Sequence, residues 1–205
     1  MGGFSGAARA LAGLIALVAW AGLAVQFNAS MTTTGSALAA VLAMLRYFTV
    51  LANLTLAIVL TGVALGQRSF GGASLLGGVT LAMLLVGAVY SLLLRDLVEL
   101  SGGAKLADLL LHHATPILAP IFWLAYAPKG ALQGRDPLMW AAFPLAYFVY
   151  ALARGLIEGR YAYPFMDLMQ LGWPRTLLNG AVIALGFLVC GYVVLWLDGR
   201  LARRV

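Results

Sequence analysis

The sequence predicts an all-α integral membrane protein, a bundle of six transmembrane helices with a polar cavity in its outward half. Of the 205 residues, 63% are hydrophobic and only 10% are charged, and the mean hydropathy is +0.96. A soluble domain of this length needs a far more charged surface. The apolar residues form six runs, each long enough to cross a bilayer as a helix of about 20 residues. Because only short loops remain, we expect one domain over residues 1–205.

Polar, glycine-rich and proline-rich segments separate the six runs. We expect spans at residues 8–27, 36–65, 73–94, 105–126, 138–157 and 175–197.

The first span starts like a signal sequence, with Arg9 ahead of an apolar core. That core is longer than the core of a cleaved leader, so we expect an uncleaved helix. The polar residues 28–35 are interpreted as a loop. The second span carries Arg46, Thr49 and Asn53, which are three and four residues apart. On a continuous helix, this spacing predicts one polar stripe.

The third span follows a short polar loop, and glycines 102 and 103 break the chain after it. The fourth span holds both histidines, His112 and His113. An ionisable side chain inside a spanning helix is costly, so it is a functional hypothesis by default. Asp108 lies one turn before His112, where its carboxylate can accept a hydrogen bond from the imidazole. Pro116 cannot donate to the carbonyl of residue 112, so we expect the helix to kink or loosen beside His112.

The fifth span presents Tyr147, Tyr150 and Arg154 at its outward end, with Glu158 on the same face. The aromatic connection that follows, residues 160–174, is interpreted as an interfacial belt or a cap over the cavity. Within it, Asp167 could cap the sixth helix or pair with an arginine of the pocket, and we favour the structural role. The single cysteine, Cys190, excludes an internal disulfide.

The charges predict an orientation in which both termini are cytoplasmic. The basic residues of the cytoplasmic side are then Arg9, Arg68, Lys129, Arg135, Arg200, Arg203 and Arg204, and those of the far side are Arg46, Arg95, Lys105, Arg154, Arg160 and Arg175. Five acidic residues also fall on the far side, namely Asp96, Glu99, Asp108, Glu158 and Asp167. Because these acidic residues match the positive charge of the far side, the charges there are typical of a functional site and are not a signal of topology. Basic residues scattered at span ends favour headgroup contacts over a nucleic-acid partner.

This topology brings the unusual polar residues together in the outward half. If Thr49 faces His112, they form a threonine nucleophile and a histidine base, with Asp108 orienting the base. The remaining polar residues could hold a carboxylate or stabilise an oxyanion. They are Arg46, Asn53, Tyr147, Tyr150 and Arg154.

Four segments carry a family resemblance: Arg46-Tyr-Phe-Thr-Val-Leu-Ala-Asn53, Leu110-Leu-His-His-Ala-Thr-Pro116, Tyr147-Phe-Val-Tyr-Ala-Leu-Ala-Arg-Gly155, and Tyr161-Ala-Tyr-Pro-Phe-Met-Asp167 with Leu171-Gly-Trp173. They resemble a bacterial family of six-span membrane proteins. That family is similar to the animal androgen-induced and androgen-dependent membrane hydrolases, which cleave fatty acid esters of hydroxy fatty acids with an intramembrane threonine and histidine.

The resemblance implies a fatty acyl ester as substrate and the bacterial inner membrane as location. It also implies Thr49 as nucleophile and His112 as base, with the adjacent His113 as the alternative register. The role of Asp108 comes from spacing alone.

Other interpretations stay open. His112 could be a packing histidine, and Thr49 could bond to a carbonyl of its own helix. A metal-dependent amidase needs three or more ligands, and paired haem ligands need facing helices, so we expect no metal and no cofactor. A transporter would be expected to show inverted repeats in its sequence. The main alternative is a non-enzymatic lipid-binding or scaffold protein that uses the same pocket.

Overall fold

The computed structural model describes residues 3–95, 97 and 99–203. Asp96 and Arg204, which enter the charge argument above, lie outside this part of the chain. The described residues form helices and connecting segments without a β-strand. Their α-helices are α1 (Gly6–Thr34), α2 (Ala37–Met44), α3 (Phe48–Ala64), α4 (Ala73–Val89), α5 (Gly102–Asp108), α6 (Thr115–Tyr126), α7 (Asp136–Glu158) and α8 (Leu168–Ala202). Short helical turns are η1 (Arg68–Phe70), η2 (Tyr90–Leu94), η3 (Leu109–Ala114) and η4 (Pro164–Met166).

Within the described part, five helices are long and apolar enough to cross a membrane. They cover Gly6–Thr34, Ala73–Leu94, Gly102–Tyr126, Asp136–Glu158 and Leu168–Ala202, and the bent pair α2–α3 makes a sixth if it counts as one span. The prediction of an all-α bundle of apolar helices is therefore confirmed, with the third span at its predicted limits.

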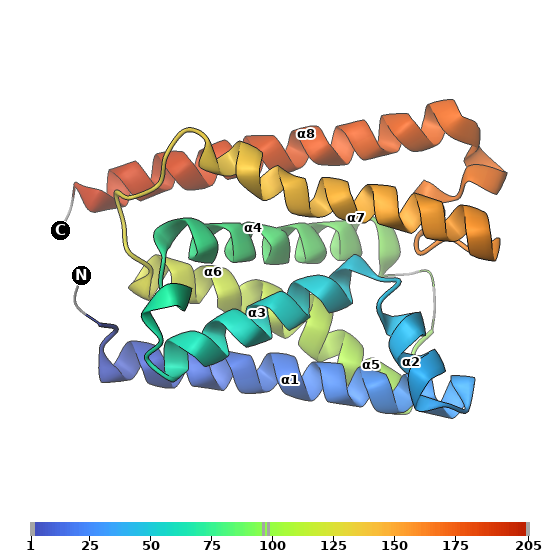
Figure 1. The fold of residues 1–205 in the computed structure, drawn as a ribbon, viewed down its shortest axis with the longest axis horizontal. Helices are drawn as coiled ribbons and strands as arrows, with labels where there is room; N and C mark the ends of the chain where they lie inside the picture. Colours follow the sequence, from blue (N-terminus) through green and yellow to red (C-terminus); the bar gives the residue numbers. More distant parts are fainter. Residues whose placement is uncertain (1–2, 96, 98, 204–205) are drawn as a thin grey trace.

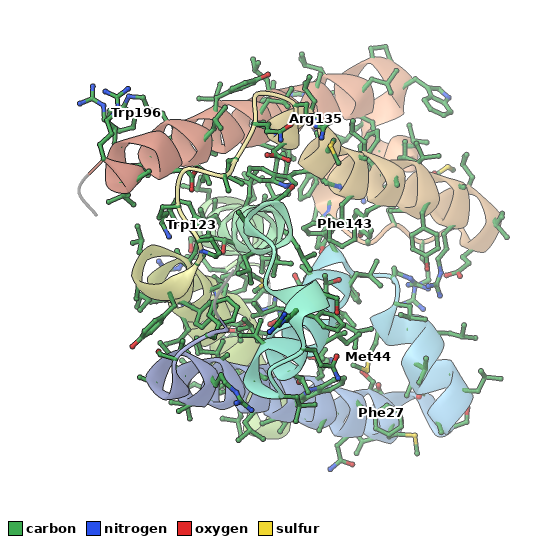
Figure 2. All side chains as sticks on the ribbon, turned by 60° about the vertical axis from the view of Figure 1, so that its left-hand side comes forward. Phe27, Met44, Trp123, Arg135, Phe143 and Trp196 are labelled. Atoms are coloured by element: carbon green, nitrogen blue, oxygen red, sulfur yellow. The ribbon has the colours of Figure 1, made fainter. Side chains whose placement is uncertain are left out.

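The helices lie roughly along one long axis (Figure 1). The pair α7 and α8 forms one face of the bundle and α1 the opposite face, with α3, α4 and α6 between them. The start of α1 and the end of α8 lie at the same end of the bundle, on the left in Figure 1. Side chains fill the space between the helices, with Phe143 inside and Trp196 at the outer surface (Figure 2).

The predicted loop at residues 28–35 is wrong, because α1 continues to Thr34. The hydroxyl groups of Thr32, Thr33 and Thr34 donate to carbonyls of the preceding turn, which lets polar residues stay helical. Gly35 ends the helix in the left-handed conformation, with φ of 74°, and its N–H donates to the carbonyl of Met31.

The predicted continuous span 36–65 is also wrong. The chain bends by 96° between α2 and α3, and α3 starts afresh after the extended residue Tyr47. The carbonyls of Leu45 and Arg46 at the bend accept hydrogen bonds from the hydroxyls of Tyr150 and Tyr147, at 3.2 and 2.8 Å. These tyrosines donate hydrogen bonds to backbone carbonyls where the chain leaves the helix. The spacing of residues in the sequence cannot reveal these contacts. Arg46 lies in the bend, so it shares no helical stripe with Thr49.

The fourth span is irregular where Pro116 predicts a kink. Residues 109–114 form a π-helical turn between α5 and α6, and the N–H of Thr115 donates to the carbonyl of Leu110, five residues back. The loosened helix beside His112 is therefore confirmed. A second π-turn, η2, ends the third span and starts at Tyr90.

The last span begins at Leu168, before the predicted residue 175. The Asp167 carboxylate accepts hydrogen bonds from the N–H groups of Met169 and Gln170, which confirms its capping role. Gly172, with φ of 68° and ψ of 167°, interrupts the helix soon after this start.

Buried polar contacts close the end of the bundle where α1 starts. Asp198 of α8 is 1% exposed and accepts hydrogen bonds from the backbone N–H groups of Gly130 and Leu132. Asp136 accepts a hydrogen bond from the hydroxyl of Ser74, at 2.6 Å. These acids therefore anchor the loop between α6 and α7.

Candidate active site

Thr49 and His112 meet between α3 and the π-turn η3. Thr49 lies in the first turn of α3 and is 7% exposed. Its Oγ1 lies 3.2 Å from Nε2 of His112, within hydrogen-bonding distance. The hydroxyl and the imidazole that the sequence analysis paired are thus neighbours, although they are 63 residues apart in the chain.

The other side of the imidazole faces a carboxylate. Nδ1 of His112 lies 2.9 Å from Oδ1 of Asp108, one turn back along the same span. A carboxylate at this position favours the tautomer that carries its proton on Nδ1. That tautomer turns the lone pair of Nε2 toward Thr49, so the nitrogen can accept the threonine proton.

Tyr90 holds this arrangement from the third span. Its hydroxyl donates a hydrogen bond to Oδ2 of Asp108, at 2.7 Å. Its ring stacks on the His112 imidazole, with centroids 4.3 Å apart and planes at 18°. Tyr90 therefore fixes both the carboxylate and the imidazole. The sequence analysis did not select it; the available signal was a hydroxyl-bearing aromatic residue near the polar end of that span.

The neighbouring histidine has a different environment. The side chain of His113 is 45% exposed, and its Nε2 lies 3.9 Å from Asp108. Its ring meets Tyr90 edge-on, at 5.2 Å between centroids. Of the two registers left open by the sequence, His112 is the one in contact with Thr49.

Asn53 is fully buried and connects the two elements of the site. Its Nδ2 donates to the carbonyls of Thr49 and Leu111, at 2.9 and 3.1 Å. Its Oδ1 accepts a hydrogen bond from the hydroxyl of Thr115, at 2.6 Å. Both amide hydrogens are therefore engaged within the protein, and a substrate contact of Asn53 stays a prediction. Asn53 joins α3 to the π-turn and so sets the separation of Thr49 and His112.

The other predicted binding residues gather at the α2–α3 bend. The guanidinium groups of Arg46 and Arg154 both pair with the Glu158 carboxylate. Arg154 also donates to the Tyr150 hydroxyl, at 2.9 Å. With Tyr147 and Tyr150 bonded to backbone carbonyls of the bend, this group holds α2 and α3 against α7. These four residues therefore position α3, Tyr147 also lines the cavity beside Thr49, and their expected substrate contacts stay a prediction.

Tyr163, from the connection between α7 and α8, is the polar neighbour that the sequence analysis missed. It is 9% exposed. Burial raises the pKa of its phenol, while the Thr49 side chain and backbone groups of Thr49 and Phe48 act to lower the same pKa. Tyr163 and Thr49 line the same cavity, and Thr49 lies in the first turn of α3, where the helix dipole is positive.

A cavity of about 190 Å³ adjoins Thr49, bounded by α3, α4, α7 and α8. Its polar lining residues are Thr49, Tyr147 and Tyr163, and the remaining lining residues are apolar. The hollow space beside Thr49 thus differs from the polar cavity expected from the sequence. The polar side chains expected to line it bond largely to one another and to the backbone.

Metal ligands do not cluster in the described part of the chain. There, no group of three or more histidine, cysteine, aspartate or glutamate side chains could hold an ion. The residues around Thr49 instead offer a hydroxyl, an imidazole, a carboxylate and two phenols.

The role of Asn53 predicts a loss of stability on substitution. In Asn53→Leu, the Leu111 carbonyl and the Thr115 hydroxyl lose their partner on α3, which should lower the free energy of unfolding by about 1–3 kcal/mol. Thermal unfolding in detergent measures this loss. Thr55→Val is the matched control, because the Thr55 hydroxyl bonds only within α3, to the Leu51 carbonyl. Equal losses in both variants would contradict the cross-link.

Comparison with known proteins gives no match. No family model matches the chain, and neither a curated protein nor a solved structure matches it.

Proposed function

We propose that this protein is an intramembrane hydrolase of fatty acyl esters, with Thr49 as nucleophile and His112 as general base. One observation carries the proposal: Oγ1 of Thr49 lies 3.2 Å from Nε2 of His112, whose Nδ1 lies 2.9 Å from Asp108. A weak hydroxyl nucleophile needs an adjacent base, and the base needs an orienting group. Because the site adjoins an apolar cavity, its substrate has an apolar chain.

In the first half of the reaction, His112 Nε2 takes the Thr49 proton while Oγ1 bonds to the ester carbonyl carbon. The carbon–oxygen bond to the alcohol then breaks, and the imidazolium returns the proton to the leaving alcohol. Asp108 stays ionised and stabilises the imidazolium. Thr49 now carries the acyl group as an ester.

The second half repeats these steps with water. His112 takes a proton from water, and the resulting oxygen attacks the acyl carbon. The bond to Oγ1 breaks, the proton returns to Thr49, and the fatty acid leaves. The side chains of His112 and His113 are 22% and 45% exposed, so the imidazole side of the site is open at the surface of the bundle, and we infer that water enters there from the outer face of the membrane.

The oxyanion is stabilised by Tyr163 and the start of α3. The N–H groups of Val50 and Leu51 already bond to the Tyr47 carbonyl, and Tyr163 lines the same cavity as Phe48 and Thr49. An oxygen that gains charge beside Thr49 therefore meets the phenol hydroxyl and the positive end of the helix.

The proposal extends to topology and family. We infer six spans, with α2 and α3 as one broken span, and both termini in the cytoplasm of a bacterial cell. The catalytic residues then lie in the outward half of the inner membrane. The paired charges of Arg46, Arg154 and Glu158 support this orientation. Excess basic charge is expected on the cytoplasmic side, and a carboxylate matches the basic charge of this cluster, so the cluster can lie on the far side. The four sequence motifs support membership of the bacterial relatives of the androgen-induced hydrolases.

Replacing the reactive pair tests the proposed chemistry. The purified protein should hydrolyse para-nitrophenyl octanoate in detergent, and Thr49→Ala should reduce turnover to background. His112→Ala should lower kcat by at least about 100-fold, the usual worth of a general base. Labelling with a fluorophosphonate probe should also be lost in Thr49→Ala.

His113→Ala is the matched control, because it removes the adjacent imidazole from the same π-turn. It should keep kcat within about threefold of the unmodified protein, as expected of a residue outside the reacting set. Turnover that persists in folded Thr49→Ala and His112→Ala would overturn the proposal.

Removal of the Tyr163 hydroxyl tests the oxyanion assignment. Tyr163→Phe should lower kcat by about 100-fold with little change in KM, because the donor acts on charge present only in the transition state. Tyr161→Phe is the control from the same segment, since the buried Tyr161 hydroxyl has no hydrogen-bond partner among the residues that the structure describes. Steady-state kinetics on both variants give the comparison, and equal kcat values for the two would refute the assignment.

A further inference from the structure

The cavity beside Thr49 has two chemically distinct parts. Its polar groups, from Thr49, Tyr147 and Tyr163, all come from the region around the start of α3. The rest of the lining is aliphatic and aromatic, and includes Val86, Val89, Phe148, Ile183, Ala184 and Phe187. The described lining contains no charged side chain. An occupant therefore needs a polar group at one end and an uncharged, apolar body.

We propose that this cavity is the acyl subsite, which holds an unbranched, uncharged acyl chain of medium length with its carbonyl carbon at Thr49. This inference rests on the proposed function. The volume of about 190 Å³ has room for a chain of several methylene groups. The part of the chain inside the cavity is therefore of medium length.

The cavity wall also reaches the outer surface of the bundle. Leu145 lines the cavity and is 49% exposed, and Ala181 of α8 is exposed as well. Lipid would cover this surface, so an acyl chain enters sideways from the bilayer. Lipid is as apolar as the cavity, so burial from water gives no selectivity there. Selection between chains comes from fit, because a chain that clashes with the wall loses its contacts.

Filling the cavity tests the subsite. Ala184 of α8 lines it, and Val182, two residues away, is 62% exposed and lies outside the lining. Ala184→Phe should lower kcat/KM for para-nitrophenyl octanoate at least tenfold more than for the acetate. Val182→Phe should leave both values as in the unmodified protein. For each ester, the variant is compared with the unmodified protein. The partitioning of that ester into detergent is then the same in both measurements.

The opposite change enlarges the cavity. Phe187 lines it and is 4% exposed, so Phe187→Leu should raise kcat/KM for the palmitate ester relative to the octanoate. This variant decides the question if Ala184→Phe does not fold.

The outcomes separate the two proposals. An unchanged octanoate-to-acetate ratio in folded Ala184→Phe overturns the acyl subsite while ester hydrolysis stands, and an unchanged palmitate-to-octanoate ratio in Phe187→Leu does the same. Absence of ester hydrolysis by the unmodified protein overturns the proposed function and the subsite with it. The expected shifts, in opposite directions for the two variants, support the subsite.

Discussion

Backbone groups that leave a regular helix need hydrogen-bond partners from the protein itself, because hydrocarbon offers none. This constraint shapes the region around Thr49. At the α2–α3 bend, Tyr150 and Tyr147 donate to the carbonyls of Leu45 and Arg46. At the π-turn, the Asn53 amide donates to the carbonyl of Leu111. Side chains of neighbouring spans thus satisfy each irregular stretch, and the same contacts fix the stretches relative to one another.

The bend and the π-turn together create the chemical geometry. A continuous helix over residues 36–65 would place Thr49 in a helix interior, where its N–H would serve the helical ladder. The bend instead puts Thr49 in the first turn of α3, beside N–H groups without helical partners. The π-turn changes the register of the fourth span at His112, and the imidazole reaches Thr49 while keeping Asp108 on its other side. The Thr49 hydroxyl, the His112 imidazole and the positive end of α3 meet because both spans are irregular.

The sequence predicts the parts of this site that depend on spacing within one helix. The pair Asp108 and His112 is four residues apart, and Pro116 marks the loosened turn beside them. The α2–α3 bend was missed because no proline or glycine lies at residues 45–47, and its cause is tertiary: hydroxyls of α7 bond to its carbonyls. Tyr90 and Tyr163 were missed for the same reason, since each acts through another segment. The contacts of Asn53 could not be predicted either, because a buried amide and a ligand-binding amide look alike in sequence.

The position of the irregular turns argues for function over packing. The π-turns η2 and η3 contact each other through the stacked rings of Tyr90 and His112, and Asn53 ties η3 to the first turns of α3. A bundle selected for packing alone gains nothing from buried polar groups and broken ladders, which cost stability in lipid. Such conflicts with local preference are expected at functional sites. Here they converge on one hydroxyl group that faces an apolar cavity, that of Thr49, as the acyl transfer that we propose would require.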